Sequence, residues 1–209
     1  MKTVIIDYGS GNIESVFNAL QAISGENEIA ISKNPAEIRS ANLLILPGVG
    51  AFADCMSGLR SVTGLAEEIR KQALVEKKPF LGICVGMQVL ASVGHENGEH
   101  AGLGFINGKV EKIDEEEGLK VPHMGWNEII VKNSKHPILK DIKEGEHFYF
   151  ANSYHFICQN ENNVLAQVEY GSKLTAIVAK ENICGVQFHP EKSGEAGLKI
   201  LKNFLNWRP

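Results

Sequence analysis

The chain has 209 residues, 44% of them hydrophobic and 22% charged, which is the composition of an ordinary globular protein with one sizeable core. Its formal net charge of −4 argues against a nucleic-acid partner, because such partners require a basic surface. No apolar run approaches a membrane span, no signal peptide is visible and the four cysteines are scattered singly, so we expect a cytoplasmic protein without a disulfide framework, a metal site or a membrane partner.

The first half of the chain alternates short apolar strands with helical spacing. Strands are expected at 3–7, 28–32, 42–46 and 79–83, and helices at 13–23, from 34–35 onward, and through 56–59 and 65–74. This alternation predicts an α/β fold with a doubly wound, mostly parallel central sheet that is covered on both faces. Sites in such sheets lie beyond the carboxyl ends of the strands, so we expect the loops at 8–12 and 47–52 to meet residue 84 there.

The second half changes character after a polar, glycine-rich loop at 95–104. Strands at hairpin-like spacing are expected at 106–113, 128–131, 148–150, 156–159, 164–169, 175–180 and 183–188. A helix at 195–207 follows, with Leu198, Leu201, Phe204 and Leu205 facing inward. We interpret this half as an antiparallel-rich C-terminal extension of the same sheet. No linker, repeat or low-complexity tract divides the chain, so residues 1–209 are predicted to form a single domain.

The stretch from Gly82 to Gly86 has the spacing of a nucleophile elbow, with Cys84 in the place of the nucleophile. In such a turn a strand ends and a helix, here expected at 87–92, begins within about one residue. The two glycines avoid a Cβ clash with the neighbouring backbone. A helix N-terminus favours the thiolate over the thiol. A buried structural cysteine in a glycine-rich turn is the alternative that this stretch alone leaves open.

A cysteine nucleophile needs a base, and the base needs an orienting acceptor. His189 ends an apolar strand and is followed by Pro190 and Glu191. Because Pro190 holds an extended chain, alternation predicts residues 189 and 191 on one side, where the carboxylate can fix the imidazole tautomer. A purely structural strand end is the alternative. Five other histidines are expected either on the surface (His95, His100 and His136) or packed at strand edges (His147 and His155).

The loop from Pro47 to Gly50 ends another strand and offers backbone N–H groups. Together with the Val85 N–H these groups can form an oxyanion hole, although the loop read alone is more simply a glycine turn. Gly9-Ser-Gly11 lacks the third glycine of a dinucleotide-binding loop, and no Walker A pattern occurs. We therefore expect no cofactor.

Several of these motifs resemble those of a known family. The stretches 82–88, 47–52 and 185–193 are similar to the three motifs of the class I, triad-type glutamine amidotransferases. Pro122-His-Met-Gly-Trp-Asn127 and Asp7-Tyr-Gly-Ser-Gly-Asn12 resemble one branch of that family, the glutaminase subunits of imidazole glycerol phosphate synthases, which act in histidine biosynthesis. The resemblance covers residues 4–193 in the expected order.

The resemblance implies that a triad of Cys84, His189 and Glu191 hydrolyses L-glutamine to glutamate and ammonia through a thioester. It implies an oxyanion hole formed by Val85 and by Val49 or Gly50, and glutamine contacts from Gly50, Gln88, Ser153 and Tyr154. It further implies a heterodimeric partner, a (β/α)₈-barrel cyclase that uses the ammonia to give imidazole glycerol phosphate and an aminoimidazole carboxamide ribotide. By motif position, contacts with this cyclase are expected at Asn12, His123, Met124, Trp126 and Lys192.

One position departs from the family pattern. Asn152 stands where the family commonly has His before a Ser/Thr-Tyr pair, which leaves the role of this side chain open. Two other functions also stay open: a paralogous glutaminase that serves a sugar-modifying synthase, and a non-catalytic scaffold subunit. The scaffold has no chemical need for the intact triad, and a general cysteine peptidase would need a peptide groove that nothing in the sequence indicates. Because the family is weakly active without its loaded partner, we expect the 47–50 loop to rearrange.

Overall fold

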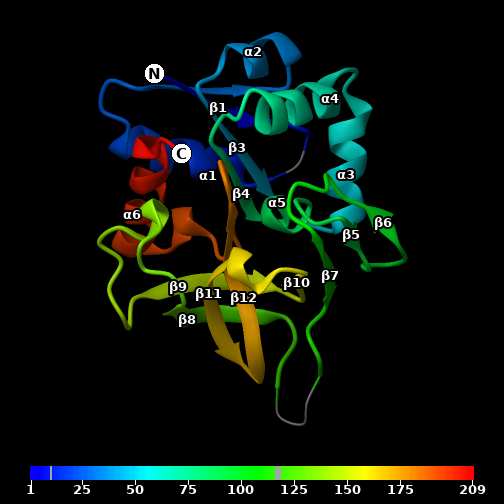
Figure 1. Cartoon of the computed structure of the whole chain (residues 1–209), viewed down its shortest axis with the longest axis vertical. Helices are drawn as coiled ribbons and strands as arrows, with labels where there is room; N and C mark the ends of the chain where they lie inside the picture. The colour runs from blue at the N-terminus through cyan, green and yellow to red at the C-terminus, as the bar shows by residue number, and fades with distance from the viewer. Residues whose placement is uncertain (10, 116–118) are drawn as a thin grey trace.

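The computed structural model describes residues 1–9, 11–115 and 119–209 (Figure 1). Within these residues, a nine-stranded sheet has the strand order β2-β1-β3-β4-β13-β12-β11-β8-β9. Its parallel block consists of β2 (Glu28–Ser32), β1 (Lys2–Ile6), β3 (Leu43–Gly48), β4 (Phe80–Cys84) and β13 (Ile183–Val186). β3 and β4 are buried along their whole length, as expected for parallel strands with both faces covered.

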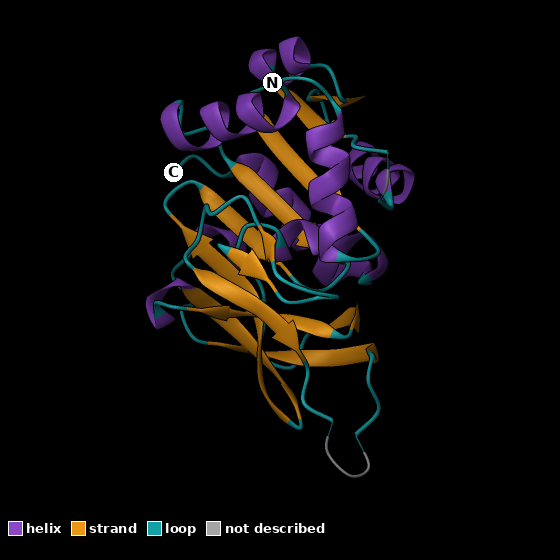
Figure 2. Ribbon diagram, turned by 90° about the vertical axis from the view of Figure 1, so that its right-hand side faces the viewer, coloured by secondary structure: helices purple, strands orange, loops and turns teal. Residues whose placement is uncertain are grey.

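Helices lie on both sides of this parallel block (Figure 2). They are α1 (Ile13–Ile23), α2 (Pro35–Ser40), α3 (Phe52–Ser61), α4 (Leu65–Arg70) with its π-turn extension Lys71–Val75, and α6 (Gly194–Asn206). α1 packs against α6, whereas α4 packs against α2 and α3. In α6 the buried stripe includes Ile200 and Leu201, and Leu198 is half-buried and packs against the same core, as its expected inward position requires.

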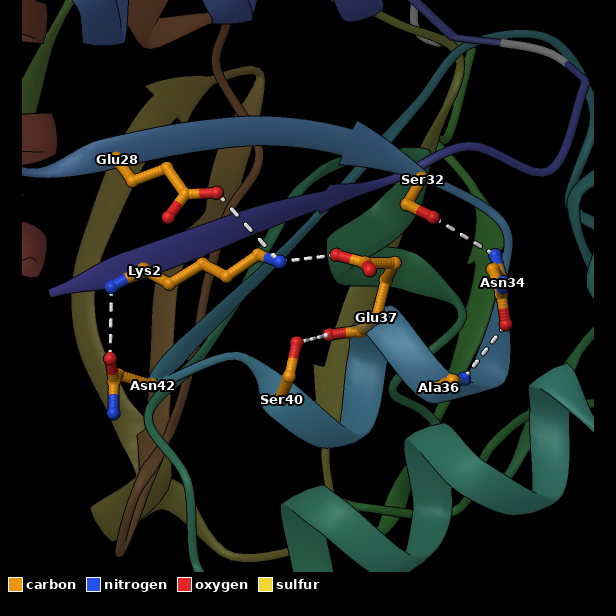
Figure 3. Close-up of polar contacts among 8 residues, drawn as sticks. All are labelled: Lys2, Glu28, Ser32, Asn34, Ala36, Glu37, Ser40 and Asn42. Carbon is orange, nitrogen blue, oxygen red and sulfur yellow. Dashed lines mark hydrogen bonds and ion pairs between the residues drawn. The ribbon is translucent and has the colours of Figure 1, made fainter.

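The corner where β1, β2 and α2 meet shows how local sequence places a helix (Figure 3). The Asn34 side chain accepts a hydrogen bond from the Ala36 N–H at 2.9 Å, and Pro35 occupies the first helical position. Both features stabilise a helix start, so α2 begins where the sequence indicated. The Lys2 ammonium lies between the Glu37 and Glu28 carboxylates, which ties the helix to the two strands.

The remaining strands of the large sheet are antiparallel: β12 (Ser172–Lys180), β11 (Val164–Tyr170), β8 (His123–Val131) and β9 (His147–Asn152). This extension confirms the predicted fold class. β8 is five residues longer at its start than expected, because 123–128 pair in register with 152–147 of β9. Residues 123–127 of the motif 122–127 are therefore part of a strand.

A second sheet, which was not expected, has the order β10-β7-β5-β6 among the described residues. It contains β10 (Tyr154–Cys158), β7 (Gly108–Lys112), β5 (Val93–Gly94) and β6 (His100–Ala101). β6 lies inside the stretch expected to be a loop, and β10 belongs to this sheet instead of the large one. In the described part of the chain, no helix has the length and apolarity that a membrane crossing requires.

Candidate active site

Cys84 is the last residue of β4, and α5 (Val85–Gln88) follows it directly. The backbone of Cys84 has φ 55° and ψ −115°, a conformation that residues other than glycine rarely adopt. Such strain is typical of a nucleophile elbow, where the turn exposes the nucleophile beyond the end of the strand. The side chain is 4% exposed and borders a cavity.

At this turn, three glycines allow backbone segments to approach each other closely. A Cβ on Gly86 would lie 1.8 Å from the Leu46 carbonyl oxygen, and one on Gly82 would lie 2.4 Å from the Gly86 carbonyl oxygen. A Cβ on Gly48 would lie 2.6 Å from the Gly86 nitrogen. No side chain fits these distances, so the glycines flanking Cys84 have the role that the sequence predicted, and Gly48 shares it.

The helix after the nucleophile is shorter than expected. α5 ends at Gln88, whereas a helix at 87–92 was predicted. The carbonyls of Val89, Leu90 and Ala91 accept hydrogen bonds from the backbone of residues 103–106, so the helix cannot continue past them. A helix of four residues has a small macrodipole, and side chains therefore carry more of the electrostatic influence on Cys84 than the sequence suggested.

His189 leaves the sheet beside the nucleophile, because β13 pairs with β4 and places Val186 opposite Ile83. Its Nδ1 lies 2.8 Å from Glu191 Oε1, so the predicted contact is present. The predicted extended chain between them is wrong. Residues Pro190–Lys192 form a 3₁₀ turn, closed by a hydrogen bond from the Lys192 N–H to the His189 carbonyl at 3.0 Å, and proline readily occupies the first position of such a turn.

The two buried groups stabilise each other's charge. Burial disfavours a charged imidazole, but hydrogen bonds with Cys84 and Glu191 outweigh burial and raise the pKa of His189 to about 9. Burial also disfavours the Glu191 carboxylate, but hydrogen bonds from His189 and from Asn12 Nδ2, at 2.8 Å, lower its pKa overall. The carboxylate therefore orients the ring through Nδ1, which leaves Nε2 available to the Cys84 thiol.

A cavity of about 370 Å³ opens over Cys84, a size suited to an amino acid. Its walls bring together most of the residues singled out in the sequence. They are the triad candidates Cys84 and His189, the oxyanion candidates Val49, Gly50 and Val85, the glutamine candidates Gln88, Ser153 and Tyr154, and the partner candidates Met124 and Lys192. Asn152 also lines it and donates through Nδ2 to the Tyr154 carbonyl at 3.0 Å.

Two polar side chains at this site were not predicted. Glu96 lines the cavity, and its Oε2 accepts a hydrogen bond from the Phe52 N–H at 2.7 Å. Glu96 falls in a stretch without hydrophobic periodicity, so nothing in the sequence indicated that its side chain would line the cavity. Gln187 is buried with its Nε2 3.8 Å from Cys84 Sγ. Its position two residues before His189 in an expected strand was a usable signal, because such residues share one face.

The partner candidates on β8 differ in exposure. Met124 and Trp126 are two residues apart in the strand and therefore lie on the same side of it. They are 65% and 57% exposed. Trp126 packs edge-on against Tyr149, and the Lys192 ammonium lies 5.9 Å from the centre of the same Tyr149 ring. These three candidates thus form one continuous exposed surface with Tyr149.

His123 does not belong to that surface. It is 3% exposed, and its ring stacks on Phe150 and Tyr170 with centroid separations of 4.7 and 3.9 Å. The expectation that its side chain contacts a partner is contradicted, because alternation along β8 turns it toward the opposite side from Met124. Its role in this structure is packing within the antiparallel sheet.

The other histidines lie away from the cavity. His95 is exposed as expected, whereas His147 is also exposed, with Nδ1 2.8 Å from the Gly145 carbonyl, and is not packed as predicted. The three half-buried ones are His100, His136 and His155. Across the described ranges, no group of three or more His, Cys, Asp or Glu side chains is arranged to hold a metal ion.

The comparisons with known proteins place this fold and site in a class. Residues 4–207 match the family model described as glutamine amidotransferase class-I, so the chain belongs to that family. The match confirms the predicted fold class and the predicted class of enzyme.

Within this family, the chain is similar over its full length to proteins named imidazole glycerol phosphate synthase subunit HisH. The protein of that name from Rhodospirillum rubrum is 47% identical, with 100% of each chain covered. The one from Pelagibacter ubique is 46% identical, with 99% of this chain and 100% of the relative covered. These matches confirm the predicted resemblance to that branch.

Solved structures support the fold independently. The structure described as PurLQS from Thermotoga maritima superposes with a TM-score of 0.75 at 23% identity, covering 98% of this chain and 97% of that one. A crystal structure described as glutamine amidotransferase gives 0.73 at 21% identity, with 98% and 99% covered.

Proposed function

We propose that this chain is the glutaminase subunit of an imidazole glycerol phosphate synthase. The observation that carries the proposal is the arrangement of Cys84 and His189 at one cavity, with the Glu191 side chain buried behind His189, in a chain so similar to subunits of that name. It hydrolyses L-glutamine to glutamate and ammonia. The reduced cysteines are in keeping with a cytoplasmic enzyme.

The chemistry follows from the groups at the cavity. Cys84 Sγ attacks the side-chain carbonyl carbon of glutamine, and His189 holds the thiol proton. The Val85 N–H and an N–H of Val49 or Gly50 stabilise the tetrahedral oxyanion. As the C–N bond breaks, His189 gives the proton to the nitrogen and ammonia leaves. Water, deprotonated by His189, then hydrolyses the glutamyl thioester to glutamate and restores the thiol.

Glutamine is recognised by its charged end as well as by its amide. Glu96 is the carboxylate on the wall of the cavity that we assign to the α-ammonium group, since Glu191 is fully buried behind His189. Gln88, Gly50, Ser153 and Tyr154 surround the remaining polar atoms of the substrate. The Asn152 side chain holds the Tyr154 carbonyl through Nδ2 at 3.0 Å, so this residue supports the backbone that we assign to glutamine binding.

Ammonia that escapes into water is protonated and lost as a nucleophile, so a tight partner is part of the proposal. The partner is the (β/α)₈-barrel cyclase, which binds at the surface of Met124, Trp126 and Lys192 and near Asn12. The surface borders the cavity, because Met124 and Lys192 line both. A paralogous synthase and a non-catalytic scaffold are the alternatives to be tested.

The test is glutamate release by the purified chain alone and with a barrel cyclase and its ribotide ligand. We expect strong stimulation by the loaded cyclase and no release by Cys84→Ala, which should still bind the cyclase. Glutamate release that the loaded cyclase does not stimulate would indicate that the chain is the glutaminase subunit of another synthase. Absence of release by the unmodified chain with the loaded cyclase would support the scaffold.

A further inference from the structure

A continuous run of buried amides connects the backbone of β10 with the nucleophile. The Gln88 Nε2 atom donates to the Tyr154 carbonyl at 2.9 Å and to Gln187 Oε1 at 3.0 Å. Gln187 Nε2 in turn lies 3.8 Å from Cys84 Sγ. The two glutamine residues are 3% and 1% exposed, so both side chains are buried.

The orientation of each amide is determined by the one before it. A backbone carbonyl only accepts hydrogen bonds, so Gln88 must turn its NH₂ group toward Tyr154. The second hydrogen of that NH₂ group then requires an acceptor from Gln187, which therefore presents Oε1 to Gln88. Turning the Gln187 amide over would place two NH₂ groups against each other and an oxygen against the sulfur. The NH₂ group of Gln187 must therefore face Cys84.

We infer that Gln187 is a catalytic residue that donates a hydrogen bond to the Cys84 thiolate, in an orientation fixed by Gln88 and the Tyr154 carbonyl. The inference deepens the proposed function and rests on Cys84 being its nucleophile. A donor aimed at sulfur favours the anion over the thiol. Because α5 is too short to provide a large dipole, this donor takes on the role first assigned to the helix.

Gln88 has two roles in this arrangement. It lines the cavity, where the substrate binds, and it holds the acceptor end of Gln187. The other titratable groups that face Cys84 are His189, which follows β13, Tyr8, which follows β1, and Cys55 of α3. None of them changes in the experiment below.

The test is alkylation of Cys84 by iodoacetamide in the full chain, from about pH 5 to about pH 9, with the modified peptide measured by mass spectrometry. The other cysteines react little in this range, because burial raises the pKa of Cys55, Cys158 and Cys184 to about 12. Gln187→Met removes the donor to sulfur, whereas Gln88→Met removes the Gln88–Gln187 bond and leaves the donor.

We expect Gln187→Met to move the pH midpoint of alkylation upward by about half to one unit, which is about a three- to tenfold slower reaction below the midpoint. Gln88→Met leaves the Gln187 amide free to turn, so it should move the midpoint in the same direction by a smaller amount, and it should also raise KM for glutamine. An unchanged midpoint in folded Gln187→Met, or a larger shift in Gln88→Met than in Gln187→Met, would overturn the inference. If Gln187→Met does not fold, Gln187→Asn, which withdraws the amide from sulfur, should shift the midpoint in the same direction.

This measurement uses no substrate, so it separates the two proposals. Alkylation of Cys84 in the parent chain without any shift in the variants would overturn the role of Gln187 alone. A parent Cys84 that resists alkylation below about pH 9 would overturn both, since the proposed glutaminase depends on a reactive thiol.

Discussion

The Asn12 side chain donates a hydrogen bond to the Glu191 carboxylate at 2.8 Å, on the same oxygen that accepts from His189. Asn12 precedes α1 at the carboxyl end of β1, and Glu191 lies in the 3₁₀ turn after β13. The loop after the first strand therefore contacts the proposed triad directly, at a residue that the sequence indicated as a partner contact.

Replacing this donor should impair catalysis without unfolding the protein. Asn12→Asp places a second carboxylate against Glu191, which raises the pKa of Glu191 and weakens its hold on the imidazole. We expect glutaminase kcat to fall by about ten- to a hundredfold. Gln21→Glu introduces the same amide-to-carboxylate change on the exposed side of α1 and should leave kcat unchanged. Equal activity of the two variants would show that the Asn12 contact has no catalytic role.

Glu96 has two roles that one substitution can separate: the proposed binding of the substrate ammonium, and the hydrogen bond to the first N–H of α3. Glu96→Gln retains an oxygen for the Phe52 N–H but removes the negative charge assigned to the α-ammonium of glutamine. We expect KM for glutamine to rise by about tenfold or more, with the melting temperature unchanged. Glu99→Gln, at an exposed position of the same loop, serves as the control. An unchanged KM in Glu96→Gln would mean that another group binds the ammonium.

Trp126 should be an anchor for the cyclase. An exposed tryptophan packed on a neighbouring tyrosine is a typical interface hot spot, and truncating one weakens binding by about 2 kcal/mol or more. Trp126→Ala should therefore raise the Kd for the cyclase by about thirtyfold, as measured by calorimetric titration. Val75→Ala changes another exposed apolar residue on the π turn and should have no effect. Comparable Kd values for both variants would place the interface elsewhere.

His123 should make the fold sensitive to acid. Burial lowers its pKa to about 4, below the value of about 6.5 in an unfolded chain. The unfolded state therefore takes up the proton first as pH falls, and stability is lost between about pH 6.5 and pH 4, by roughly 3 kcal/mol in total.

His123→Phe should remove that share of the acid sensitivity, because a phenyl ring fits between Phe150 and Tyr170 and does not titrate. Urea unfolding at several pH values measures it, and the stability difference between variant and parent should grow as the pH is lowered. His95→Gln, at an exposed site, should follow the parent curve. A constant difference across the window would show that protonation of His123 does not contribute.

The glycines of the elbow should tolerate no side chain. Gly86→Ala forces a Cβ to within 1.8 Å of the Leu46 carbonyl oxygen, so the elbow and its strands must move apart. We expect a loss of about 3 kcal/mol or more in the free energy of unfolding, together with loss of glutaminase activity. Gly25→Ala, which has a positive φ but open space around it, should lose only about 1 kcal/mol. Similar losses in both would rule out the clash as the cause.

The sequence was most informative where neighbours along the chain determine the structure. Alternating apolar runs predicted the parallel block, and Asn34 with Pro35 marked the start of α2 because capping and a fixed φ act within three residues. The elbow could also be predicted, since its glycines are required by the turn itself. Cys84 and His189 could be paired because parallel strands end at a common edge.

Features that depend on distant partners could not be predicted. The length of α5 is decided by hydrogen bonds from residues 103–106, and nothing in the apolar spacing after Met87 records them. His123 is buried because rings from β9 and β11 stack on it, and its own motif gives no sign of this. The Asn12–Glu191 bond joins residues 179 positions apart, a separation across which local patterns carry no information.

The pairing of β3 with β4 ends at Gly48, which lies opposite Cys84. Gly50, two residues later, is exposed, has φ +85° and has no atom within 4 Å of where a Cβ would be. The peptide plane between Val49 and Gly50 has room to rotate through opposite changes in ψ of Val49 and φ of Gly50, while the strand before it stays paired. Glycine accepts both signs of φ at little energetic difference. Under the proposed function, supplying or withdrawing the oxyanion donor then requires movement of a single peptide unit, with no repacking of the core.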